Sequence, residues 1–130
     1  MQQMMTTMVL AWICLLSLEI SGNGIRAYAQ DCKYPLSESV FKQHKQQLER
    51  ASFEEDRMKM ATAFLKQKKC MKVSQIKSVI QLFNFEDNQL TLAKLAYGFV
   101  HDPENYQEVI AIFTEAPVRK TLTRFISKRK

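Results

Sequence analysis

The sequence predicts an all-α domain, a compact array of about six short helices built from a repeated helix pair. Residues 52–61 return, slightly changed, as residues 84–93, at an offset of 32. Residues 79–83 match residues 109–113 at an offset of 30. A fixed period of about 30 residues is typical of a supersecondary unit that stacks on copies of itself. No segment alternates with period two, so we expect no sheet.

Six segments carry apolar residues at helical spacing. They span residues 38–50, 53–67, 74–83, 85–100, 103–113 and 117–127. The first follows Ser37, and the fifth follows Asp102 with Pro103 at its first position, both of which favour a helix start. Each helix is short and needs packing to persist. The repeat therefore predicts two full helix pairs, flanked by a half-unit at each end.

The two copies of the repeat begin with signals for a helix start. Ser52 and Glu55 form a capping box, and Asn84 with Asp87 is a weaker version of it. Consecutive acidic residues at these points also favour the positive end of a helix. They lack the alternating oxygens and the turn glycine that a calcium loop needs. We therefore interpret both acidic runs as helix starts.

One phenylalanine follows each of these predicted caps. Phe53 and Phe85 occupy equivalent positions in the two copies. We expect both side chains to be buried, as wedges that pack back onto the neighbouring helix pair. The alternative is an exposed role in ligand binding.

The N-terminus predicts secretion. Residues 8–18 form an apolar run that is too short to span a bilayer, which needs about 20 residues, and that suits a signal peptide. Small residues at Ala27 and Ala29 provide a cleavage site; cleavage after Gly24 is a second candidate, and an uncleaved amphipathic anchor is the alternative. The predicted organisation is a signal peptide (1–29), a leader (30–36), one helical-repeat domain (37–127) and a basic tail (128–130).

Cysteine content supports one disulfide. Cleavage after Ala29 removes Cys14 and leaves Cys32 and Cys70. In an oxidising compartment two cysteines allow one intramolecular pairing, which we expect to hold the leader against residues 67–72. Closing a loop of about 38 residues stabilises the fold by roughly 4 kcal/mol in the chain-entropy model. The alternatives are an intermolecular bridge and a catalytic thiol.

The repeated pattern also resembles a known family. Its elements are x-Phe-acidic-acidic-x-x-Leu/Met-x-Leu/Met-Ala, then Val-Ser-Gln-Ile-Lys-Ser-Val-Ile at 73–80, then Phe-Val-His-Asp-Pro-Glu-Asn-Tyr at 99–106. Together they resemble a domain family of unknown function found in secreted or envelope proteins, over residues 37–127. The resemblance implies an all-helical repeat and provides no catalytic residue to transfer.

The sequence lacks the common signatures of catalysis. It contains no glycine-rich phosphate loop, no Gly-x-Ser-x-Gly, no His-Glu-x-x-His and no cysteine–histidine metal spacing. His44 lies on the apolar stripe of the first helix, where we expect a half-buried side chain with a backbone partner rather than a base or metal ligand. His101 is expected to interact with the end of the fourth helix. We therefore expect no enzyme, no cofactor and no metal.

Charge is the feature that bears on function. The chain has 19 Lys and Arg against 13 Asp and Glu, a net charge of +6. The excess forms two clusters, which we predict to contact a partner: Lys66, Lys68, Lys69 and Lys72 around Cys70, and Arg119, Lys120, Arg124 and Lys128 outside the apolar arc of the last helix. A solvated face is the alternative interpretation of both.

These observations favour a secreted interaction module, expected to be a monomer, that binds an extracellular protein or a sulfated polyanion. One alternative is a cationic host-defence protein that acts on membranes through the last helix; a membrane surface is the less favoured partner. Another is a small carrier of a lipophilic ligand. Nucleic acid is not expected, because no stacking platform for single strands is present.

Overall fold

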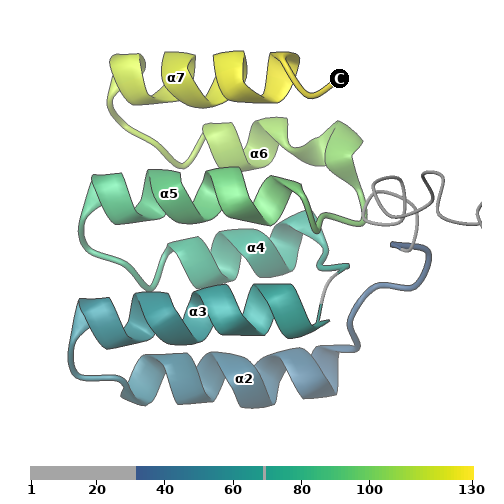
Figure 1. Cartoon of the computed structure of the whole chain (residues 1–130), viewed down its shortest axis with the longest axis vertical. Helices are drawn as coiled ribbons and strands as arrows, with labels where there is room; N and C mark the ends of the chain where they lie inside the picture. Colours follow the sequence, from purple (N-terminus) through teal and green to yellow (C-terminus); the bar gives the residue numbers. More distant parts are fainter. Residues whose placement is uncertain (1–31, 69) are drawn as a thin grey trace, which may run out of the picture.

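The computed structural model describes residues 32–68 and 70–130, which form a stack of six α-helices (Figure 1). The predicted signal peptide, residues 1–29, and Lys69 lie outside the described residues. The helices are α2 (Glu38–Arg50), α3 (Glu54–Lys68), α4 (Val73–Ile80), α5 (Glu86–Tyr97), α6 (Gln107–Ile110) and α7 (Ala116–Ser127), with a 3-10 turn, η1 (Pro103–Asn105), before α6. The all-α class is confirmed: in the described ranges the only extended pairing is an isolated bridge between Met71 and Val100.

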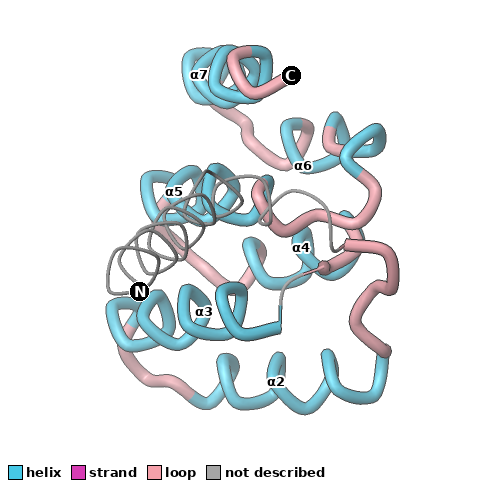
Figure 2. The backbone as a smooth tube through the Cα atoms, turned by 45° about the vertical axis from the view of Figure 1, so that its right-hand side comes forward, coloured by secondary structure: helices cyan, strands magenta, loops and turns pink. Residues whose placement is uncertain are grey.

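The helices form two layers. Helices α3, α5 and α7 run in one direction and pack side by side, whereas α2, α4 and α6 run in the opposite direction in the second layer (Figures 1 and 2). The chain crosses from one layer to the other at every turn. All three helices of the first layer therefore begin at one edge of the stack and end at the other, on the right of Figure 1.

The core lies between the two layers and follows the predicted apolar stripes. Each helix contributes fully buried side chains, among them Leu48, Phe64, Ile80, Ala93 and Leu122. Gln75 is the buried polar residue of this region. Its amide nitrogen donates to the Leu36 carbonyl oxygen at 3.0 Å, and its oxygen accepts from the Lys72 backbone N–H at 3.0 Å. This side chain therefore ties the leader to the start of α4.

The predicted capping boxes are wrong. Helix α5 begins one residue later than expected, with Phe85 at the N-cap and no side-chain cap of its own. The carboxylate of Glu54, from the preceding helix pair, accepts the backbone N–H of Phe85 at 3.1 Å and that of Asn84 at 3.3 Å. Glu86 accepts the backbone N–H of Glu115 at 3.5 Å in the same way. The acidic residues thus cap the next unit rather than their own.

The predicted burial of two phenylalanines is also wrong. Phe53 and Phe85 are 71% and 66% exposed. Both immediately precede a helix, and the Phe53 carbonyl accepts the backbone N–H of Arg57, so this residue stands in the N-cap position. At that position the side chain points away from the inter-layer core and toward solvent.

The fifth predicted helix, residues 103–113, is interrupted. The turn η1 ends at Asn105, and α6 spans only Gln107–Ile110. Asp102 does not cap this segment with its side chain; its carboxylate instead accepts the backbone N–H of Val73, the first residue of α4, at 2.7 Å. After the turn, the buried Tyr106 hydroxyl donates to the Ala93 carbonyl oxygen at 2.6 Å. The segment around the break therefore bonds two other helices, α4 through Asp102 and α5 through Tyr106.

A long polar side chain at the fourth position of α3, α5 and α7 bonds backbone carbonyl oxygens of the turn that precedes the helix. Arg57 donates to the carbonyl oxygens of Leu48, Ala51 and Leu82. Gln89, at the equivalent position of α5, donates to that of Phe83, and Arg119 of α7 donates to those of Phe113 and Thr114. The same contact closes the turns α2–α3, α4–α5 and α6–α7. The fold therefore consists of three equivalent helix pairs, and the prediction of two pairs flanked by half-units is wrong in this detail.

Candidate interaction surface

The basic residues gather where the helices of the first layer end. We define the basic edge as Lys66 and Lys68 at the end of α3, Lys94 in the last turn of α5, and Lys128, Arg129 and Lys130 after α7. Cations are favoured at a helix C-terminus because the carbonyl end of the helix carries a partial negative charge. Since α3, α5 and α7 run in one direction, these positions share the right-hand edge in Figure 1. Part of each predicted cluster, Lys66 and Lys68 of the first and Lys128 of the second, thus lies at one edge together with Lys94.

Ion pairs involve other residues. Among residues 32–68 and 70–130, four ion pairs form: Lys45–Glu49, Lys59–Glu55, Lys72–Glu38 and Lys77–Glu108. No cation of the basic edge takes part in these pairs. Lys72, which the sequence groups with Lys66 and Lys68, differs because its ammonium lies 3.5 Å from the Glu38 carboxylate.

The predicted contact residues of α7 divide into two groups. Lys120, Arg124 and Lys128 are exposed, as expected for a solvent-facing side of the helix. Arg119 instead lies at the opposite edge of the stack, where its guanidinium bonds the carbonyl oxygens of Phe113 and Thr114 at 2.8 and 2.7 Å. Its charge therefore supports the α6–α7 turn.

A hollow of about 380 Å³ opens beside the basic edge. Its lining comes from α5 and the residues that follow it, and from the end of α7: Lys94, Leu95, Gly98, Phe99, Phe125 and Arg129. The Arg129 guanidinium lies 4.3 Å from the centre of the Phe125 ring, and the Lys94 ammonium lies 5.8 Å from it. Two cations therefore flank one aromatic ring, an arrangement suited to an anionic group attached to an apolar one.

A second hollow, of about 210 Å³, lies between α2 and α3. His44 stacks on the Phe64 ring there, with ring centres 4.4 Å apart, and Gln47, Met60 and Gln67 complete much of its rim. His44 is half-buried, as predicted, and its partner is an aromatic ring rather than the backbone group expected. The residues that line this hollow include no acidic residue and no cysteine.

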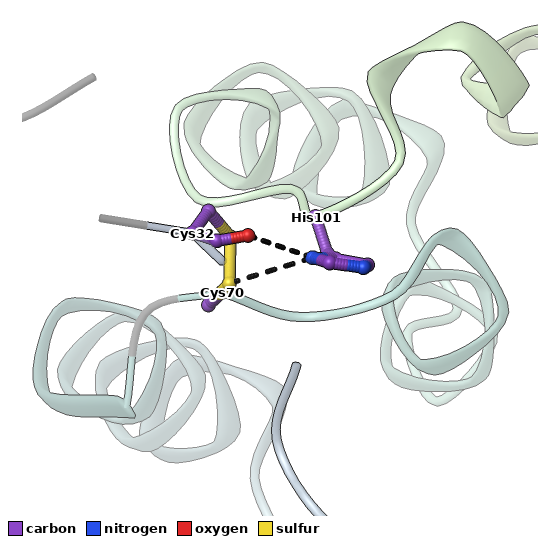
Figure 3. Close-up of side chains that lie close together, drawn as sticks. All are labelled: Cys32, Cys70 and His101. Carbon is purple, nitrogen blue, oxygen red and sulfur yellow. Dashed lines mark hydrogen bonds between the residues drawn. A yellow bond between two sulfur atoms is a disulfide. The ribbon is translucent and has the colours of Figure 1, made fainter. Parts of the chain in front are cut away.

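The predicted cysteine pair lies at disulfide distance (Figure 3). The Cα atoms of Cys32 and Cys70 are 4.6 Å apart, and the bond connects the leader to the segment between α3 and α4. The Leu36 backbone N–H also donates to the Cys70 carbonyl oxygen at 3.0 Å. Cys70 has a φ of 62°, in the left-handed region that is uncommon for residues with a side chain. The leader is thus held against this segment, as the sequence predicts.

His101 lies beside this disulfide rather than serving the end of α5. Its Nδ1 is 2.7 Å from the Cys32 carbonyl oxygen and 3.8 Å from the Cys70 sulfur (Figure 3). Its backbone N–H donates to the Met71 carbonyl oxygen at 2.8 Å. Sequence reasoning missed this group because His101 is 31 residues from Cys70 and 69 from Cys32.

No helix in the part of the chain that the structure describes is both long enough and apolar enough to cross a bilayer.

The chain belongs to a family that is described as a domain of unknown function, DUF4476, whose family model matches residues 35–126. The match covers all six helices up to the last turn of α7, includes Cys70 and His101, and excludes Cys32 and the basic tail. No curated protein and no solved structure matches the chain. The family assignment thus confirms the resemblance and assigns no activity.

Proposed function

We propose that the protein is a secreted helical interaction module that binds a polyanionic partner, such as a sulfated polysaccharide, through its basic edge. The observation that carries the proposal is the common direction of α3, α5 and α7. It brings cations from three separate segments to one edge, where none forms an ion pair with another described residue. Such a concentration of one sign of charge attracts an anionic partner.

The hollow beside the basic edge supports the choice of an anionic partner. Phe125 provides an apolar surface between the Lys94 ammonium and the Arg129 guanidinium. A sulfate or carboxylate placed there can pair with both cations while the backbone of its carrier rests on the ring. A partner with repeated anionic groups can then continue along the edge to Lys66 and Lys68.

Secretion is supported by two features. The apolar run at residues 8–18 suits a signal peptide. The Cys32–Cys70 pair at disulfide distance suits an oxidising compartment. Expressed from its own N-terminus in a secreting host, the protein is expected in the medium with Gln30 as its first residue. Retention of the full-length chain inside the cell would contradict this part of the proposal.

The two alternative functions have less support. Helix α7 buries Leu122 and Ile126 in the core, so insertion of its apolar face into a membrane requires the helix to detach from α5. The two hollows described above are open and partly lined by charged or polar side chains, which suits a lipophilic cargo poorly. Neither alternative uses the basic edge as directly as a polyanion contact does.

Salt elution from immobilised heparin tests the proposal. The basic-edge variant carries Lys94→Gln, Lys128→Gln and Arg129→Gln. The control variant removes equal charge from α2 and the first half of α3 through Lys42→Gln, Lys45→Gln and Lys59→Gln. The basic-edge variant is expected to elute at clearly lower salt than the parent, and the control variant close to it. Exposed charges act over about 8–10 Å at physiological ionic strength, so position matters as well as net charge.

The control decides between a site and bulk charge. Equal losses of retention in the two triple variants would mean that heparin senses only net charge, and the proposed edge would then have no special role. Circular dichroism of each variant shows whether the helices remain formed. A cation-exchange column of matched capacity gives the retention expected from charge alone.

A further inference from the structure

Near the end of α3, three side chains with metal-ligating atoms meet at one point. The Cys32 and Cys70 sulfurs and a ring nitrogen of His101 all lie within 4.8 Å of one another. They come from the leader, the segment between α3 and α4, and the segment that follows α5 (Figure 3). Three distant parts of the chain thus bring together two thiol groups and an imidazole, a donor set that favours zinc.

We propose that reduction of the Cys32–Cys70 disulfide converts this cluster into a zinc site, with both sulfurs and His101 Nδ1 as ligands. Tetrahedral zinc with its usual bond lengths separates two sulfurs by about 3.8 Å and a sulfur from a nitrogen by about 3.6 Å. His101 Nδ1 already lies 3.8 Å from the Cys70 sulfur. Opening the sulfur–sulfur bond is therefore the main adjustment that the site requires.

Backbone contacts hold the ligand segments together independently of the disulfide. The Met71 N–H donates to the Phe99 carbonyl oxygen, and the His101 N–H donates to the Met71 carbonyl oxygen, both at 2.8 Å. These bonds join the segment that carries Cys70 to the one that carries His101. On the other side, the Leu36 N–H donates to the Cys70 carbonyl oxygen. The reduced protein thus retains a largely preformed site, which lowers the cost of ordering the ligands on binding.

The chemistry balances in two steps. A dithiol supplies two electrons and two protons, which convert the disulfide into two thiols, and leaves as its own disulfide. Zinc then displaces the two thiol protons and binds two thiolates. In the oxidised form Nδ1 of His101 donates to the Cys32 carbonyl oxygen, because a carbonyl oxygen can only accept. Metal binding at Nδ1 therefore requires this hydrogen bond to break and the remaining ring proton to reside on Nε2.

We expect a water molecule to be the fourth ligand of the tetrahedral zinc. Asp102, the acidic residue next to His101, is engaged elsewhere: its carboxylate accepts the Val73 backbone N–H and the Asn105 side-chain amide. Three protein ligands and a water constitute an open zinc site rather than a closed structural one. The oxidised and metal-bound forms exclude each other, since both use the same two sulfurs.

Cobalt(II) titration tests this site, because tetrahedral cobalt thiolate complexes absorb in the visible range whereas zinc does not. The purified chain, carrying Cys14→Ser so that only Cys32 and Cys70 supply thiols, is reduced with dithiothreitol and desalted without oxygen. One equivalent of cobalt is expected to produce tetrahedral thiolate bands that zinc abolishes. The oxidised protein is expected to produce none.

Two histidine variants make the test specific. His101→Asn is expected to weaken cobalt binding more than tenfold, and His44→Asn, which removes a histidine that is not part of the cluster, is expected to bind like the parent. Circular dichroism of the reduced proteins verifies that their helices persist. The absence of tetrahedral bands, or equal binding by the His101→Asn protein and the parent, would overturn the proposal whatever the outcome of the heparin experiment.

Discussion

Arg57 is expected to be the most important polar side chain for the stability of this fold. Its guanidinium donates to the carbonyl oxygens of Leu48 at 3.0 Å, Ala51 at 2.7 Å and Leu82 at 2.7 Å. Leu48 lies in the last turn of α2 and Ala51 is its C-cap, whereas Leu82 follows the C-cap of α4. One side chain thus closes a turn and joins two helix pairs. Replacement by Met keeps most of the apolar stem and removes all three bonds.

The magnitude follows from the number and setting of these bonds. A hydrogen bond with a charged donor contributes about 1 kcal/mol or more to stability, and a part-buried carbonyl left without a partner adds to the loss. Arg57→Met is therefore expected to lower the free energy of unfolding by about 3 kcal/mol. Arg119→Met loses two bonds, one of them exposed, and Gln89→Met loses one neutral bond. We expect about 2 and about 1 kcal/mol for these variants.

Urea unfolding measures this series. The midpoint should shift in the order Arg57, Arg119, Gln89 while the slope stays unchanged, since the surface exposed on unfolding is the same. Arg50→Met, an exposed arginine in the last turn of α2, serves as the control and should change stability by less than about 0.5 kcal/mol. A loss for Arg57→Met no greater than that for Gln89→Met would refute the reasoning.

Three further predictions concern single side chains. Tyr106→Phe should cost about 1–2 kcal/mol in urea unfolding, because the buried bond from the Tyr106 hydroxyl to the Ala93 carbonyl oxygen is lost; an unchanged midpoint would contradict this. Burial opposes ionisation of Glu54, but hydrogen bonds from Asn88, Phe85 and Asn84 outweigh it and lower its pKa below 4.5. The stabilisation that ionised Glu54 provides is therefore present above pH 4.5 and is lost as the pH falls through the folded pKa. The difference in unfolding free energy between Glu54→Gln and the parent should shrink on acidification, and a constant difference would contradict this prediction. Phe85→Ala should change stability by less than about 0.5 kcal/mol, whereas a loss above about 2 kcal/mol would indicate burial.

Local signals in the sequence predict much of this fold. Helix α2 spans Glu38–Arg50 as expected, because Ser37 accepts the Val40 N–H and the apolar stripe follows directly. The start of α5 could not be predicted in the same way. Its cap is supplied by Glu54, 31 residues away from Phe85, and the cap of α4 is supplied by Asp102, 29 residues from Val73. A window of local sequence contains no information about such contacts.

In the candidate site, too, local sequence identifies some residues and misses others. Counting charges along the chain finds Lys66, Lys68 and Lys128 but cannot separate them from Arg119, whose charge is used inside the fold. Lys94 was missed because it is isolated in sequence and joins the other cations only when the helices align. The cysteine pair was predictable because only two cysteines remain after the expected cleavage. Its histidine neighbour was not, since nothing in the spacing connects His101 to either sulfur.

The arrangement of charge follows from the helix direction in the first layer. Acidic residues favour helix starts and basic residues favour helix ends, and every helix of this layer points the same way. A repeat of this kind therefore produces an acidic edge and a basic edge even without selection for binding. Cations beyond the end of a helix need a different explanation. Lys128, Arg129 and Lys130 follow the last residue of α7, and Arg129 covers the Phe125 ring at the mouth of a hollow. The α7 end of the basic edge therefore carries more positive charge than the helix dipoles explain, whereas the α3 end does not. We expect a polyanionic partner to bind most strongly at the α7 end.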